Sequence, residues 1–215
     1  LEKRRYAEEH IDDLRRSLMW EPRGHADMYG ALLTAPTTDD GDLGVLFLHN
    51  DGFSTMCGHG IIALGTILWE TGMTSQNELK LDTPAGRVNV CLQTTDQRAE
   101  RVSFINVASF VDSLEYTVHV PEFGDLVVDI AFGGAYYAFC EAEAVGLTLD
   151  RPHGQQIIAA GRAIKAALLE HLHLRHPDHD DLGFLYGVIF TGPALNDEAH
   201  SRHACVFANG ELDRS

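Results

Sequence analysis

A helix that is apolar on every side must be enclosed by the rest of its domain, and this sequence predicts one. The helix expected at residues 58–71 carries apolar side chains at 61–64 and again at 67–69. Gly65 lies in its middle, where glycine costs about 1 kcal/mol relative to alanine, so we interpret it as a position of close packing. A chain with such a helix needs strands or further helices that wrap around it.

The other segments predict a mixture of strands and helices without a regular β-α-β alternation. A continuous apolar run at 43–49 predicts a buried strand. The periodicity of 7–19 predicts an amphipathic helix whose apolar face carries Ile11, Leu14, Leu18 and Met19. Further strands are expected at 30–35, 78–82, 87–93, 101–107, 116–120, 125–132, 136–140, 183–190 and 203–208, and a second amphipathic helix at 155–172.

These elements divide into two lobes of similar size, residues 1–113 and 114–215, and the mixture within each half favours the α+β class. The segments VLFLHNDGFSTMCG and CVFANGELDRS both run from an apolar strand into an asparagine, a glycine and a polar turn. This similarity indicates an internal repeat. The chain begins in a charged helical segment and stops soon after the second of these segments, so we expect it to be part of a longer protein.

The composition argues against several classes of function. A formal net charge of −16 disfavours nucleic acid as a partner, because phosphates would be repelled. No run approaches the roughly 18 apolar residues of a membrane span, and no signal peptide opens the chain. The cysteines are widely spaced and form no C-x-x-C pair, which predicts reduced thiols and a cytoplasmic location. They are Cys57, Cys91, Cys140 and Cys205.

Cys57 stands where the helix at 58–71 begins, and Gly58, His59 and Gly60 follow it. A cysteine that caps this helix would leave the amides of the first turn pointing outward, and with the helix dipole they would bind an anion such as a carboxylate. The same dipole stabilises a thiolate, and glycines let a ligand approach the backbone closely. The stretch therefore combines a candidate base or nucleophile with a candidate carboxylate site.

Three other interpretations stay open at this point. Cys57 also fits a buried structural cysteine, since cysteine is among the most buried residue types. Cys57 and His59 offer two zinc ligands where zinc sites need three or four, and the tract from His171 to His179 fits a solvated helix end better than a metal site. GHGIIA, with Asp82 about twenty residues later, has the outline of a dinucleotide fingerprint, although several residues separate its glycines from the preceding strand.

MCGHG with its apolar helix resembles the first catalytic motif of the proline racemase superfamily, whose members act on proline and hydroxyprolines without a cofactor. EPRGHADMYGALL, DTPAG, VDIAFGGAYYAF and the final DRS fall in the order of that family, so the resemblance covers nearly the whole chain. It implies a two-lobed fold similar to diaminopimelate epimerase, with a curved sheet around a central helix in each lobe and the active site in the cleft between lobes. It also implies a second catalytic motif directly after DRS, so that the C-terminal lobe here is incomplete.

The resemblance assigns roles residue by residue. Cys57 matches the thiol that removes the Cα proton, and Gly58 and His59 match the positions whose amides hold the substrate carboxylate. The His59 side chain and Asp213 match residues around the substrate ring nitrogen, and Phe207 matches an apolar wall of the pocket. The implied partners are a small imino-acid substrate and a second copy in a homodimer, with no metal and no cofactor.

The superfamily contains two kinds of reaction. Racemases and 4-hydroxyproline epimerases use two thiols, whereas trans-3-hydroxy-L-proline dehydratases keep the first cysteine and have threonine or serine in place of the second, a position two residues after Ser215. RGHADMYG, LGVLFLHNDGFSTMCGHG and GIIALGT resemble the dehydratase branch. We therefore expect dehydration to Δ1-pyrroline-2-carboxylate, with a two-thiol racemase or epimerase and a non-catalytic amino-acid-binding homologue as the alternatives.

Overall fold

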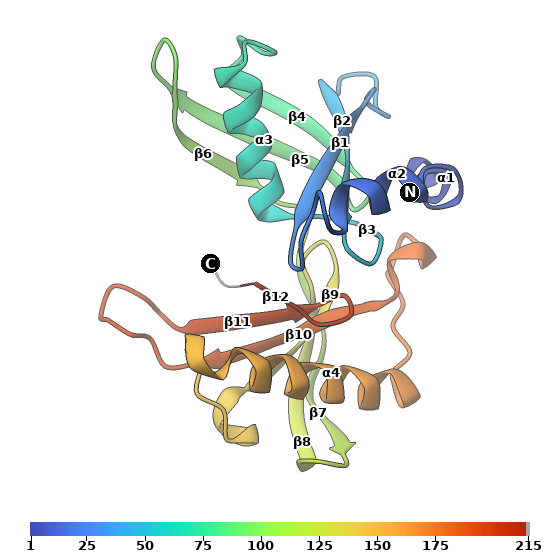
Figure 1. Cartoon of the computed structure of the whole chain (residues 1–215), viewed down its shortest axis with the longest axis vertical. Coiled ribbons are helices and arrows are strands. Elements are labelled where there is room, and N and C mark those ends of the chain that lie inside the picture. Colours follow the sequence, from blue (N-terminus) through green and yellow to red (C-terminus); the bar gives the residue numbers. More distant parts are fainter. Residues whose placement is uncertain (214–215) are drawn as a thin grey trace. The chain divides into compact units, whose positions relative to one another are not determined.

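The structure is a computed structural model that describes residues 1–213 (Figure 1). The chain divides into two compact units, Leu1–Ala108 and Ser109–Ser215, called here the first and second lobes. Each lobe contains one mixed β-sheet with a helix packed on it, as the predicted α+β class requires. The division expected after residue 113 falls inside a strand, β7 (Phe110–Val120), which belongs to the second lobe.

The first lobe is built on a six-stranded sheet in the order β1-β2-β4-β5-β6, with β3 paired to β2. Its elements are α1 (Glu2–His10), α2 (Asp12–Met19), β1 (Tyr29–Thr34), β2 (Leu43–His49), β3 (Phe53–Ser54), α3 (Gly58–Glu70), β4 (Glu78–Thr83), β5 (Gly86–Thr94) and β6 (Ala99–Ile105). The strand expected at 43–49 is β2, residue for residue, and it is buried from Gly44 onward.

The parallel pairing of β2 with β4 requires a crossover connection, and α3 supplies it. The face of α3 that carries Ile61 and Leu68 packs on the sheet in one hydrophobic core. A Cβ atom on Gly65 would lie 2.8 Å from Val102 Cγ1 and 3.0 Å from Leu92 Cδ2, so the missing side chain lets the helix approach the sheet. The close packing predicted at Gly65 is confirmed.

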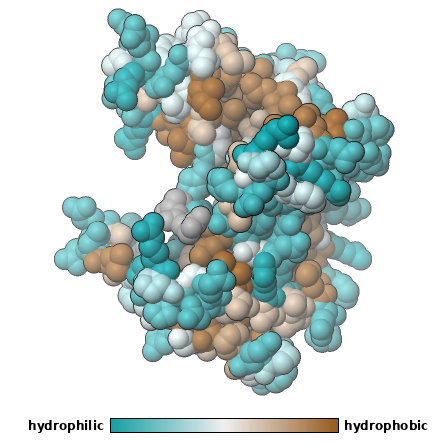
Figure 2. Space-filling model, in the orientation of Figure 1, coloured by the Kyte–Doolittle hydropathy of each residue, from teal (hydrophilic) through white to brown (hydrophobic). Residues whose placement is uncertain are grey.

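One face of α3 is more exposed than the sequence predicts. Ile62 and Ile67 are 40% and 52% exposed. Figure 2 shows hydrophobic surface, in brown, over the part of the first lobe where Figure 1 places α3. The prediction that this helix is enclosed on every side is therefore wrong within residues 1–213, where the sheet covers only one face.

The amphipathic helix expected at 7–19 is two helices, α1 and α2, which meet at Ile11 with φ −128° and ψ 16°. The predicted apolar face is confirmed only in part: Met19 is buried and Ile11 packs beside it, whereas Leu14 and Leu18 are 51% and 41% exposed. Arg15 is buried instead. Its guanidinium group donates hydrogen bonds to backbone carbonyls of the turn after β2, and these bonds hold this face of α2 inward.

The second lobe has a six-stranded sheet in the order β12-β11-β10-β9-β8-β7, with β9 and β10 parallel. Its further elements are β8 (Gly124–Phe132), β9 (Tyr136–Glu141), α4 (Gly154–His171), β10 (Leu185–Gly192), β11 (Arg202–Phe207) and β12 (Glu211–Asp213), with short 3-10 helices at Ala142–Val145, Arg151–His153 and Asp180–Leu182. α4 crosses between the parallel strands and buries Ile157, Ile164 and Leu168, so the amphipathic helix predicted at 155–172 is confirmed. None of the helices within residues 1–213 has the length and hydropathy of a membrane span.

A tight antiparallel hairpin with a very short second strand recurs in the two lobes. In the first lobe β2 pairs with β3, and Leu48 lies opposite Phe53. In the second lobe β11 pairs with β12, and Phe207 lies opposite Glu211. These hairpins are the two segments whose sequences suggested a repeat, so the predicted similarity is confirmed at the level of local structure.

Asp82 anchors the loop that leads into β2. Its buried Oδ2 accepts hydrogen bonds from the amides and hydroxyls of Thr37 and Thr38 at 2.8 to 3.2 Å, and Arg87 Nε donates to Oδ1 at 2.7 Å. Burial opposes ionisation of Asp82, but the hydrogen bonds from Arg87, Thr38 and Thr37 outweigh it and hold the pKa of the carboxyl well below its usual range. The carboxylate thus anchors a loop within the first lobe. Both of its oxygens already accept hydrogen bonds from the protein, which argues against the role of ribose ligand that the dinucleotide fingerprint would give to Asp82.

We expect Asp82→Asn to lower the free energy of unfolding by about 2 kcal/mol at pH 7, because a buried charged acceptor is lost. The pKa of Asp82 is lower in the folded chain than the value of about 4 in an unfolded one, so its contribution is complete above pH ~4 and is lost as the pH falls below that value. Urea unfolding at several pH values measures both effects.

Asp39→Asn is the matched control, because Asp39 is exposed on the same loop and the change in charge is identical. It should shift stability by less than about 0.5 kcal/mol. Equal stability of the two variants at pH 7 would contradict the anchoring role of Asp82.

Candidate active site

Cys57 is the N-cap of α3. Its backbone is extended, with φ −146° and ψ 112°, and its Sγ accepts a hydrogen bond from the Gly60 amide at 3.3 Å. The first hydrogen bond within the helix runs from Ile61 N to Cys57 O at 3.0 Å. The predicted capping position is therefore confirmed, and the sulfur lies at the positive end of the helix dipole.

The amides of Gly58 and His59 lie in the first turn of α3, ahead of the first helical hydrogen bond. N–H groups at such positions point away from the helix along its axis. An anion that binds there lies beside the Cys57 sulfur and receives both hydrogen bonds and the dipole field. The His59 side chain is exposed at the same helix end. The structure thus brings three of the predicted site residues together in the first lobe.

The glycines around Cys57 also have a packing role that the sequence did not indicate. A Cβ atom on Gly60 would lie 2.7 Å from Phe47 Cε1, and one on Gly58 would lie 3.2 Å from Phe104 Cζ. Phe47 is fully buried on β2, so it leaves little room for the first turn of α3. Glycine therefore lets the helix start close to the sheet, whatever its value for ligand access.

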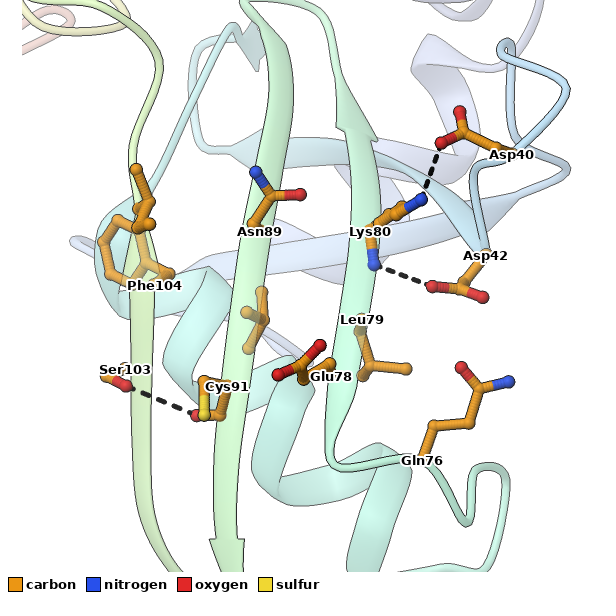
Figure 3. Close-up of a pocket in the computed structure, with 12 residues that line it drawn as sticks. Asp40, Asp42, Gln76, Glu78, Leu79, Lys80, Asn89, Cys91, Ser103 and Phe104 are labelled. Atoms are coloured by element: carbon orange, nitrogen blue, oxygen red, sulfur yellow. Dashed lines mark hydrogen bonds and ion pairs between the residues drawn. The ribbon is translucent and has the colours of Figure 1, made fainter.

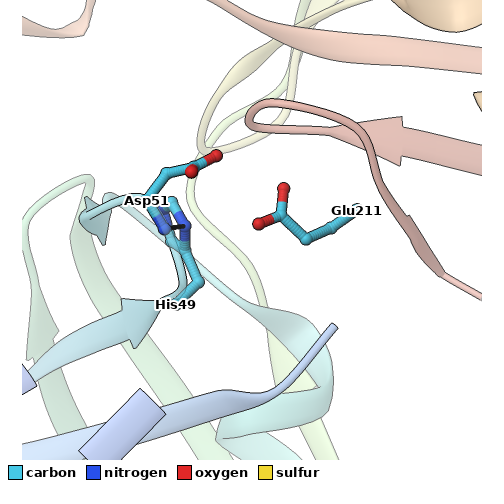
Figure 4. Close-up of side chains that lie close together, drawn as sticks. All are labelled: His49, Asp51 and Glu211. Carbon is cyan, nitrogen blue, oxygen red and sulfur yellow. Dashed lines mark hydrogen bonds between the residues drawn. The ribbon is translucent and has the colours of Figure 1, made fainter. Parts of the chain in front are cut away.

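The turn between β2 and β3 is held by hydrogen bonds from residues of α2 and its C-terminal end, which the sequence did not indicate. Arg15 Nη1 donates to the carbonyls of His49 at 2.8 Å and Asn50 at 2.5 Å, and Trp20 Nε1 donates to Asn50 O at 2.8 Å. Within the turn, the Asp51 amide donates to His49 Nδ1 at 3.2 Å (Figure 4). No periodicity signals this role, because the partners of Arg15 are carbonyls that only the folded turn presents.

Phe207 and Asp213 lie on one hairpin of the second lobe, at the ends of β11 and β12. Both residues are half-buried. The Phe207 ring packs on Tyr186, with 5.8 Å between ring centroids. The remaining residues of the DRS motif, Arg214 and Ser215, lie outside the described residues. The structure thus places both residues predicted to contact the substrate ring on the β11–β12 hairpin.

The other cysteines have different surroundings from Cys57. Burial raises the pKa of Cys140 to about 11, and the nearby Glu141 carboxylate adds to the shift. Burial raises the pKa of Cys205 to about 12. Both thiols therefore stay protonated at neutral pH and are poor bases. Cys91 is exposed on β5, so Cys57 is the one cysteine of the four at a helix N-terminus.

A groove of about 870 Å³ on β4, β5 and β6 is separate from this site (Figure 3). Lys80 lies in it, with its Nζ 2.6 Å from Asp40 Oδ2 and its amide donating to Asp42 Oδ2 at 2.7 Å. Hydrogen bonds from Arg87 and Lys80 lower the pKa of Asp40 to about 2. Lys80 thus binds Asp40 and Asp42 within the groove, and we assign the groove no ligand.

The histidine-rich tract is solvated only in part. His171, His173 and His179 are exposed, as expected. His176 instead packs edge-on against Phe132, with 4.6 Å between ring centroids, and lies 5.7 Å from the ring of Phe110. This histidine closes an aromatic cluster over the β7–β8 hairpin, a role that composition alone does not reveal.

The chain is a two-lobed α+β protein in which each lobe has one mixed sheet and one crossover helix. Cys57, at the N-terminus of α3, is its candidate thiol site. The chain belongs to the proline racemase family, whose model, described as proline racemase, matches residues 1–215. The predicted resemblance to this family is thereby confirmed.

Two curated relatives and one solved structure illustrate the similarity. A protein of Colwellia psychrerythraea named trans-3-hydroxy-L-proline dehydratase is 43% identical over 211 residues, which are 96% of this chain and 59% of the relative. The Homo sapiens protein of the same name is 41% identical over 224 residues, which are 100% of this chain and 63% of the relative. This chain therefore spans less than two thirds of the length of these relatives.

The solved structure is a hydroxyproline epimerase from Agrobacterium vitis with bound trans-4-hydroxy-L-proline. Its TM-score to this chain is 0.87 at 27% sequence identity, and the match covers 95% of this chain and 60% of that one. The match confirms the predicted fold class.

Gly187 determines how closely β11 approaches β10 beside Phe207. The two residues lie opposite each other in the antiparallel register. A Cβ atom on Gly187 would lie 2.3 Å from Val206 O and 2.8 Å from Phe207 Cα, which are backbone atoms that cannot move without disturbing the pairing.

We expect Gly187→Ala to lower the free energy of unfolding by about 3 kcal/mol, because the added methyl group overpacks against backbone. Gly192→Ala on the same strand is the control, since a Cβ there meets Leu149 Cδ1 at an ordinary 3.4 Å. Urea denaturation of both variants measures the difference. Equal losses would show that close approach at Gly187 is not what requires glycine.

Proposed function

We propose that this chain forms the first catalytic half of an enzyme that dehydrates trans-3-hydroxy-L-proline to Δ1-pyrroline-2-carboxylate without a cofactor. The observation that carries the proposal is the position of Cys57 at the N-cap of α3, in a chain 41% to 43% identical to proteins named as that dehydratase. The fold, the motif order and the surroundings of the other thiols support the same choice of base.

Cys57 is the proposed base at Cα. A proton on this carbon is hard to remove beside an ionised carboxylate, because negative charge accumulates there in the transition state. Amides at a helix N-terminus stabilise such charge without reorganisation, and Gly58 and His59 are the proposed donors. The helix dipole that favours the bound carboxylate also favours a thiolate at Cys57, so one structural element serves both binding and proton removal.

Phe207 and Asp213 are the proposed contacts for the five-membered ring. Phe207 supplies an apolar surface for the ring carbons, and Asp213 and the His59 side chain hold the ring nitrogen by hydrogen bonding. Support comes from their match to the family motif and from their shared position on the β11–β12 hairpin.

The proposed reaction balances as an elimination of water. The thiolate takes the Cα proton, the electrons of that bond form a double bond between Cα and C3, and the C3–oxygen bond breaks. The hydroxyl group takes up a proton and leaves as water. The enamine that remains tautomerises to the cyclic imine, so no oxidant or reductant is consumed.

A second candidate is a two-thiol racemase or 4-hydroxyproline epimerase. The similarity to the hydroxyproline epimerase of Agrobacterium vitis favours it, since the two chains share one fold. In that case Cys57 would still remove the Cα proton, and a second thiol would return one on the opposite face. The greater identity to the named dehydratases leads us to prefer elimination.

The proposal extends to assembly and location. We propose a homodimer in the cytoplasm, on the basis of the family resemblance and of four cysteines that form no disulfide with one another. Light scattering on the intact protein tests the dimer, and fractionation of the source cells tests the location.

We expect Cys57→Ser to lower kcat for trans-3-hydroxy-L-proline by about 10²- to 10⁴-fold, because a serine hydroxyl is a far weaker base than a thiolate. Product is measured as the cyclic imine. Cys91→Ser is the control, since it makes the same chemical change at an exposed position on β5 and should leave kcat unchanged.

Deuterium incorporation from solvent separates the alternatives. Elimination predicts imine formation by the wild type, whereas a racemase or epimerase would incorporate deuterium at Cα with the hydroxyl retained. Interconversion of L- and D-proline without loss of water from the 3-hydroxy substrate would overturn the dehydratase. Binding of proline-type ligands without exchange at Cα would point to a non-catalytic homologue.

A further inference from the structure

The Lys165 side chain connects α4 to two other elements of the second lobe. Its Nζ donates hydrogen bonds to Tyr186 O on β10 at 2.9 Å and to Ala208 O in the β11–β12 turn at 2.7 Å. Tyr186 O also accepts from the Ala208 amide at 3.1 Å. A single half-buried ammonium group thus joins the helix, a central strand and the turn of the adjacent hairpin.

The turn that Lys165 holds has an unusual backbone. Ala208 and Gly210 both have positive φ, 50° and 116°, and alanine rarely adopts such a conformation. Gly210 N closes the turn by donating to Phe207 O at 2.9 Å. Interactions from outside the turn must therefore offset the strain at Ala208, and its carbonyl is the group to which Lys165 donates.

A second cation from α4 reaches the same turn. Arg162 lies three residues before Lys165 and so on the same side of the helix, and its Nε donates to Asn209 O at 2.5 Å. A Cβ atom on Gly210 would lie 2.0 Å from that Nε, which shows how closely the guanidinium group covers the turn. Two consecutive carbonyls of the turn therefore receive charged donors from one helix.

The turn carries the residues proposed to contact the substrate ring. Phe207 comes directly before it, and Asp213 ends the three-residue strand that follows. The Phe207 ring packs on Tyr186, and the carbonyl of Tyr186 is the other group that Lys165 holds. Lys165 thus holds both the turn and the residue against which the Phe207 ring packs.

We propose that Lys165 is a positioning residue of the active site: through Tyr186 O and Ala208 O it sets the orientation of Phe207 and Asp213 toward an imino-acid substrate. Arg162 reinforces the same turn through Asn209 O. This inference rests on the proposed function. It assigns a task to a lysine whose ammonium group donates to two backbone carbonyls.

The test is the effect of Lys165→Met on KM, because contacts made equally with the bound substrate and the transition state affect KM and leave kcat nearly unchanged. We expect the KM for trans-3-hydroxy-L-proline to rise about 10-fold in the intact protein, with kcat within about 3-fold of wild type. Lys165→Arg, which retains charged donors, should restore most of the loss. A purely structural role would lower the melting temperature and leave the KM of the folded fraction unchanged.

Lys80→Met is the matched control, since it removes the same charge from the first lobe, where Lys80 is paired with Asp40. Its KM should equal that of the wild type. Arg162→Met keeps the test decisive if Lys165→Met fails to fold, and it should raise KM in the same direction by a smaller factor. An unchanged KM in every folded variant at these two positions would overturn the positioning role.

The two proposals fail in different ways. Absence of turnover by the wild type would overturn the proposed function, and the role of Lys165 with it. Turnover by the wild type, together with a wild-type KM in Lys165→Met, would overturn the positioning role alone.

Discussion

The parallel pairing of β2 with β4 determines where the chemistry of the first lobe lies. Parallel strands cannot be joined by a tight turn, so the chain that leaves β2 needs a long crossover before it returns as β4, and α3 forms most of that crossover. The N-terminus of α3 therefore follows the carboxyl end of β2, where sheets with parallel strands commonly bind ligands. Cys57 caps that helix end. The second lobe repeats the crossover with β9, α4 and β10, but there the helix supports a turn through Lys165.

Elements with strong local patterns were predictable from sequence, and elements set by polar contacts were not. β2 and α4 follow directly from a buried apolar run and a 3.6-residue period. The break at Ile11 and the burial of Arg15 did not, because an arginine in an amphipathic helix is normally read as part of its solvated face. Its inward orientation depends on carbonyls 34 and 35 residues away in sequence.

The candidate site was predictable where it rests on a local motif. A cysteine before glycines and an apolar helix predicts an N-cap, and the structure confirms the cap at Cys57. The prediction of an unpaired Gly60 amide is wrong, because this amide donates to the Cys57 sulfur. Phe207 and Asp213 were predicted only through family resemblance, since no spacing singles them out. The supports of both regions were missed. Lys165 and Arg15 donate hydrogen bonds to backbone carbonyls. Every residue has a backbone carbonyl, so the residue type at the accepting position does not indicate such a bond.

The environments of the cysteines determine which of them a thiol reagent would modify. Cys140 and Cys205 remain protonated at neutral pH and would react slowly, whereas Cys91 is exposed on β5. The number of alkyl groups bound per chain would therefore equal neither the number of cysteines nor the number of candidate thiol sites. A label on Cys91 would add to any label on Cys57. Covalent probes of the site are interpretable only in a chain from which the Cys91 thiol has been removed.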